Sequence, residues 1–153
     1  MTHISCSTLI TISMLIVVPS VAEAGPPLIC HPFQTASTTL LPWGAGPGWN
    51  TPDESYDMAR LTEDTLAVLT PDSPILARME NLRRAVIYAS RNPQLASELL
   101  TAILVRAKGP EATRLAIFDA GYVIETFKQA RHLFGHVPTD QDGYAMVRTA
   151  IAM

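Results

Sequence analysis

Prolines divide residues 53–153 of this chain into segments that each have the length of a single helix. Pro52, Pro74, Pro93 and Pro110 each precede apolar residues at helical spacing, and a fifth such run follows Thr139. Because proline is tolerated in the first turn of a helix but not in its interior, these positions predict helix starts near residues 52, 73, 92, 110 and 139. The links between the segments are short, so helices adjacent in sequence are expected to be antiparallel.

The sequence therefore predicts an all-α fold of about five antiparallel helices, a helical-hairpin or tetratricopeptide-like bundle, after an irregular N-terminal arm. The repeated proline-led helix pair resembles tetratricopeptide-like arrays in its length of about 35–40 residues, without that family's Trp, Leu, Gly and Tyr pattern. In the longest segment, Gly121 weakens helix propensity and so predicts a close contact with another helix. Gly135 predicts the end of that segment.

Residues 1–24 have the layout of a secretory signal. An apolar run of 15 residues without charge is followed by Pro19 and by VAEA, which places Ala22 and Ala24 at the small-residue positions of a cleavage site. A membrane-spanning helix needs about 20 apolar residues, which makes an uncleaved anchor the weaker alternative. We expect cleavage before Gly25, export to the periplasm or the medium, and contact with a membrane only in transit.

Residues 25–52 are rich in Gly and Pro and predict an extended arm. The arm also carries Phe33, Trp43 and Trp49. Each tryptophan brings a large apolar area, so we expect the two to pack on the helical domain of residues 53–153. If they do not, the same three aromatic side chains are the candidate surface for a partner.

Cys30 would be the single thiol after cleavage, which excludes a disulfide within the mature chain. With Pro27 and His31 it forms P-x-x-C-H, a c-type haem motif in which proline replaces the first cysteine. We therefore expect no covalently attached haem or other cofactor. We expect Cys30 to be structural or to face a partner.

His132 and His136 are four residues apart, the spacing of two metal ligands on one helix face. Together with Cys30 and His31 they form the candidate zinc or copper set of this chain. A helix end at Gly135 would turn His136 away from the face of His132.

The sequence contains no Ser/His/Asp order, no glycine-rich phosphate loop and no HExxH motif, so we expect no enzymatic activity. The net charge is -3 and no dense basic run occurs, which argues against nucleic acid as a partner. Asp119, in AIFDAGY, is the acidic residue best placed for burial, where an arginine or a helix end would bind it.

These features favour an exported, non-catalytic helical interaction module that binds a peptide or protein partner through a helical face or through the arm. The alternative is a small metal- or redox-linked periplasmic protein that uses Cys30 and His31 with His132 and His136.

Overall fold

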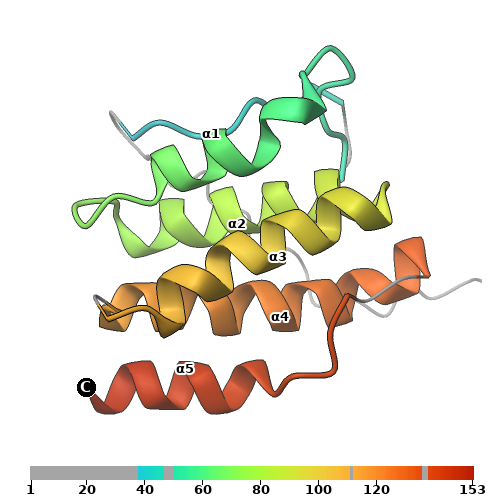
Figure 1. The fold of residues 1–153 in the computed structure, drawn as a ribbon. Helices are drawn as coiled ribbons and strands as arrows, with labels where there is room; N and C mark the ends of the chain where they lie inside the picture. Colours follow the sequence, from blue (N-terminus) through green and yellow to red (C-terminus); the bar gives the residue numbers. More distant parts are fainter. Residues whose placement is uncertain (1–37, 47–49, 111, 136–137) are drawn as a thin grey trace, which may run out of the picture. The chain divides into compact units, whose positions relative to one another are not determined.

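A computed structural model describes residues 38–46, 50–110, 112–135 and 138–153. All regular structure in these residues is helical, which confirms the predicted all-α class (Figure 1). The elements are the 3-10 helix η1 (Met58–Arg60) and the α-helices α1 (Leu61–Val68), α2 (Ile75–Ala89), α3 (Pro93–Lys108), α4 (Arg114–Phe134) and α5 (Gly143–Ala152). Among the described helices, none combines the length and the apolar character needed to cross a bilayer. The signal segment 1–24 and arm residues 25–37 lie outside the described residues.

The helices pack as stacked antiparallel hairpins. Each of them contacts the next along the chain, and α1 also contacts α3 while α2 contacts α4. Contacts with the next helix and with the one after it are those that repeated helical hairpins make. In Figure 1, α3 runs obliquely between α2 and α4, and α5 lies along α4.

The apolar core lies between α1, α2, α3 and α4. Its members come from the inward faces of these helices, with Leu41 added from the segment before them. The largest apolar side chains that are almost fully buried are Leu41, Leu61, Leu69, Leu82, Val86, Tyr88, Leu99, Ile103, Val123, Ile124 and Phe127.

Two helix boundaries follow the local signals in the sequence. Asn92 precedes α3 and its side chain accepts a hydrogen bond from the N–H of Gln94, with Pro93 as the first helical residue and Gly109 after the last. Gly135 ends α4 in the left-handed conformation, at φ 74°, and its N–H donates to the carbonyl of Arg131. The predicted stop at Gly135 is therefore confirmed.

The predicted start of the first helix at Pro52 is wrong. Asp53 accepts hydrogen bonds from the N–H and the hydroxyl of Ser55, which forms a turn, and the Asp53 N–H donates to the hydroxyl of Tyr88. Because the backbone of Asp53 is bound by a side chain of α2, the chain makes a turn and then the short helix η1, and the helix α1 begins only at Leu61.

Three further starts come later than predicted. Ser73 does not cap α2: its hydroxyl donates to the carbonyl of Val68 and accepts from the N–H of Thr70, so it closes α1. The starts predicted near residues 110 and 139 are likewise replaced. Thr113 caps α4 and Asp142 caps α5. Each accepts from an N–H in the first turn of its helix, as side-chain caps do.

Gly121 lies where α4 and α5 approach most closely, so the predicted helix contact is confirmed. A Cβ atom at this position would lie 2.6 Å from the carbonyl oxygen of Gly143 and 2.9 Å from Cγ2 of Val147. The crowding is reciprocal, because a Cβ on Gly143 would overlap the carbonyl oxygen of Gly121. Gly143 and Val147, the two residues that a side chain on Gly121 would meet, both belong to α5. A side chain on Gly121 would therefore push α4 and α5 apart.

We expect Gly121→Ala to destabilise the protein by about 1–3 kcal/mol, as overpacked helix contacts do. The sign of this change in unfolding free energy is informative, since Ala in place of an unhindered helix Gly stabilises a protein by about 1 kcal/mol. Unfolding in urea measures the difference. Gln129→Ala, at an exposed position of α4, serves as the control with a change below about 0.5 kcal/mol. A gain in stability for Gly121→Ala would contradict the close contact.

Candidate functional site

Most of the residues selected from the sequence fall outside the described part of the chain. Cys30, His31, Phe33, Trp49 and His136 are in this group. The predicted metal set and the predicted partner surface therefore stay predictions.

The structure places His132 and Trp43, and also Asp119, which is described with its partners below. His132 is exposed in the last turn of α4. No cluster of three or more His, Cys, Asp or Glu side chains that could hold a metal ion occurs among the described residues.

Trp43 packs on α2, as predicted. Its ring meets the ring of Tyr88 edge to face, with 5.6 Å between the centroids. The guanidinium carbons of Arg83 and Arg84 lie 5.0 and 5.3 Å from the centroid of the Trp43 ring. These cation–π and aromatic contacts come from one face of one helix, so they align the chain around Trp43 along α2.

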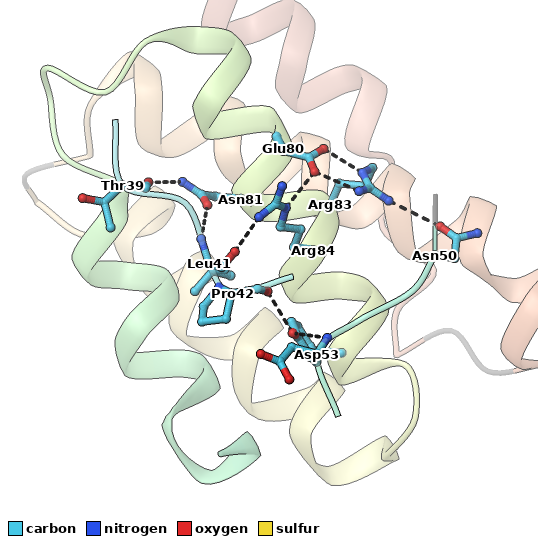
Figure 2. A network of polar contacts seen from close by, with 10 residues as sticks. Thr39, Leu41, Pro42, Asn50, Asp53, Glu80, Asn81, Arg83 and Arg84 are labelled. Atoms are coloured by element: carbon cyan, nitrogen blue, oxygen red, sulfur yellow. Dashed lines mark hydrogen bonds and ion pairs between the residues drawn. The ribbon is translucent and has the colours of Figure 1, made fainter. Parts of the chain in front are cut away.

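Residues 38–46, here called the strap, are held on α2 through their backbone (Figure 2). The buried amide of Asn81 accepts from the N–H of Leu41 at 2.8 Å and donates to the carbonyl of Thr39 at 3.1 Å. Arg84 donates to the carbonyl of Leu41 at 2.6 Å. The hydroxyl of Tyr88 donates to the carbonyl of Pro42 at 2.8 Å.

The strap is a structural part of the domain. Asn81, Arg84 and Tyr88 are spaced so that they share one face of α2, and the side chain of Leu41 enters the core. The described strap residues therefore cover the face of α2 that carries Asn81, Arg84 and Tyr88.

We expect Trp43→Ala to lower the free energy of unfolding by about 2 kcal/mol, since the half-buried ring loses its aromatic and cation–π contacts. Trp43→Phe keeps the edge-to-face contact with Tyr88 and is the matched control, with a loss about half as large. Thermal unfolding of both variants measures the effect. Identical melting of Trp43→Ala and wild type would show that the strap adds nothing to stability.

A second polar cluster is buried where α2, α3 and α4 meet. Arg78 of α2 and Asp119 of α4 form an ion pair with 2.6 Å between Nη1 and Oδ2, and both side chains are 1 % exposed. The burial of Asp119 beside an arginine is thus as predicted. Arg78 also donates through Nη2 to the carbonyl of Thr70, and Arg106 of α3 donates through Nη2 to the carbonyl of Leu69 at 3.1 Å.

The two arginines bind the end of α1. Leu69 and Thr70 follow the last residue of that helix, so their carbonyls belong to the turn between α1 and α2. The guanidiniums of Arg78 and Arg106 therefore tie this turn to α2 and α3. This arrangement also brings both side chains together from helices α2 and α3.

The cluster contains polar atoms that the described residues do not satisfy. Nε of Arg78, Nη1 of Arg106 and Oδ1 of Asp119 are buried without a hydrogen-bond partner there. Buried polar atoms are nearly always hydrogen-bonded, so three in one cluster are unusual. Burial raises the pKa of Asp119 to about 6, although the charges of Arg78 and Arg106 act to lower it.

A cavity of about 470 Å³ opens beside this cluster, between the α1–α2 turn, the end of α3 and the start of α4. We call it the arginine cavity. Both Arg78 and Arg106 line it, whereas no acidic residue is among its described lining. The other lining residues are Leu69, Pro71, Val105, Gly109, Pro110, Thr113, Leu115 and Ala116.

The sequence analysis missed Arg78 and Arg106. A signal existed for Arg78, because it precedes the buried Leu82 by four residues and thus lies on the buried face of α2. For Arg106 no local signal exists, since its role depends on the carbonyl of Leu69, 37 residues earlier.

No protein-family model matches this chain, and the comparisons with curated proteins and with solved structures give no match either.

Proposed function

We propose that the protein is an exported, non-catalytic helical module that binds a peptide or protein partner. The observation that carries this proposal is the arginine cavity, a concave site with apolar walls and two convergent guanidiniums. Binding sites typically combine such walls with a few polar groups that fix the orientation of the ligand.

The surface around the cavity supports a partner of peptide character. Val105, at the cavity, is 65 % exposed, and Ile75 and Leu76, within one turn of Arg78, are also exposed. Apolar side chains next to arginine are typical of the centres of protein interfaces.

Asp119 has a pKa near neutrality, a property that catalytic acids and bases share. Its side chain is buried, is bound to Arg78 and does not line the cavity. A group that cannot touch a ligand in the cavity cannot exchange a proton with it, which favours binding over catalysis.

Selection from a random peptide library tests the proposal. We expect wild-type protein to enrich peptides that no longer bind Val105→Glu, because this variant puts an acidic, bulky side chain at the cavity. Ile151→Glu changes an equally exposed apolar residue on α5 and is expected to keep the enriched peptides. Equal binding of those peptides by Val105→Glu would contradict the proposal.

For export, we expect the mature chain to begin at Gly25, because VAEA follows the apolar run of residues 1–24. N-terminal sequencing and intact mass of the protein purified from its native host measure this. Recovery of the chain with residues 1–24 attached would contradict it.

A further inference from the structure

We infer that the arginine cavity binds a monocarboxylate on an apolar stem, such as the C-terminal carboxylate of a peptide that ends in an apolar residue. The inference rests on the proposed function and names the chemistry that its partner brings to the cavity.

The charges of the cluster favour a monoanion. Arg78 and Arg106 bring two positive charges and Asp119 brings one negative charge, and no other described residue supplies a charge that acts on Asp119. One positive charge therefore remains in excess at Arg106, which is half-buried, beside the buried pair of Arg78 and Asp119. A carboxylate neutralises this charge, whereas a dianion such as sulfate would leave a negative charge in excess.

Two donors that are buried in the wall of the cavity match two oxygens. Arg78 keeps its Nε–H and Arg106 keeps an Nη1 N–H without a described partner, and both residues line the cavity. The remaining nitrogens that the structure assigns are used by Asp119 and by the carbonyls of Leu69 and Thr70. A carboxylate can accept one hydrogen bond from each guanidinium, and such charge-assisted bonds are the strong ones in proteins.

The rest of the lining favours an apolar stem behind the carboxylate. Leu69, Val105, Leu115 and Ala116 present only apolar side chains to the cavity. Thr113, also in the lining, caps the first turn of α4. A helix N-terminus favours negative charge, and here it borders the cavity that Arg78 and Arg106 also line.

The experiment is a titration of ¹⁵N-labelled full-length mature protein that follows the Arg Nε–H signals by NMR. N-acetyl-leucine is expected to shift the Arg78 Nε–H signal and to bind at least about tenfold more tightly than N-acetyl-leucinamide, because the amide lacks the charge. Inorganic sulfate is expected not to move that signal.

Two variants separate the site from general electrostatics. Arg106→Gln is expected to weaken binding of N-acetyl-leucine by at least about tenfold. Arg114→Gln removes an exposed arginine at the start of α4 and is expected to bind as wild type does. Unfolding midpoints of both show whether each variant is folded.

Three outcomes would overturn the inference. They are equal binding of N-acetyl-leucine and its amide, binding that survives Arg106→Gln unchanged, and an Arg78 Nε–H signal that none of the compounds moves. If one of these outcomes occurred while library peptides still bound the wild type and not Val105→Glu, peptide binding at the cavity would be retained. Only the claim that a carboxylate is recognised there would be lost. If 4-methylpentanoate, the free acid with the same stem, bound as tightly as N-acetyl-leucine, the site would be a carboxylate site but its peptide source would be overturned.

Discussion

Asp119→Ala is expected to lower the free energy of unfolding by about 3–5 kcal/mol, whereas replacing both partners, as Arg78→Met with Asp119→Leu, is expected to leave it unchanged or raise it. The single change leaves the guanidinium of Arg78 buried, at 1 % exposure, without its counterion. The double change removes both charges and fills the space with apolar side chains of similar volume. Urea unfolding of the single and double variants measures the two effects.

The reason for this asymmetry is the cost of taking both charges out of water. The attraction between Arg78 and Asp119 offsets that cost only if the remaining polar atoms find partners. Nε of Arg78 and Oδ1 of Asp119 have none among the described residues. If the double variant were as unstable as Asp119→Ala, the pair would be a net source of stability and this explanation would be wrong.

The stability of the wild type relative to Asp119→Asn is expected to fall by about 2 kcal/mol as the pH rises from 4 to 7. Burial raises the pKa of Asp119 from 3.8 to about 6 in the folded protein, against the charges of Arg78 and Arg106. Between these two values the folded state binds more protons than the unfolded state. The contribution of Asp119 is therefore complete below pH 3.8 and is lost as the pH rises through about 6.

The comparison with Asp119→Asn is needed because other carboxylates change the unfolding free energy with pH in the opposite direction. Burial raises the pKa of Glu80, but hydrogen bonds and charge from Arg83 and Arg84 outweigh it, so the net pKa is lowered. The stability that Glu80 contributes is present at high pH and is lost as the pH falls. Both proteins contain Glu80, so the difference between their unfolding free energies isolates Asp119. A difference that stays constant from pH 4 to 7 would contradict the raised pKa.

Local signals were sufficient to predict the fold class and those helix ends that depend on neighbouring residues. Asn92, Pro93 and Gly109 act within one turn of α3, and Gly135 ends α4 by its own conformation. The start predicted at Pro52 failed because Tyr88, 35 residues away from Asp53, binds the backbone there. A contact of that kind depends on the folded packing and leaves no trace in the local pattern.

The candidate site could be predicted only in part for the same reason. The apolar neighbours of Asp119 indicated that it is buried, and the need to pair a buried charge predicted an arginine or a helix end as its partner. Which arginine it meets depends on the packing of α2 against α4, which joins residues 41 positions apart. The cavity is formed by the α1–α2 turn, the end of α3 and the start of α4, with Arg78 from α2, so no single stretch of sequence contains it.

The most direct test of the central claim is the affinity of the Arg78→Met, Asp119→Leu protein for N-acetyl-leucine, measured together with its stability. The account predicts a protein at least as stable as the wild type that binds this ligand at least about tenfold more weakly, because the Arg78 Nε–H donor is gone. That result would show that Arg78 is needed to bind the ligand and is not needed for the stability of the fold. Unchanged affinity in a folded double variant would contradict the claim that Arg78 serves a ligand in the arginine cavity.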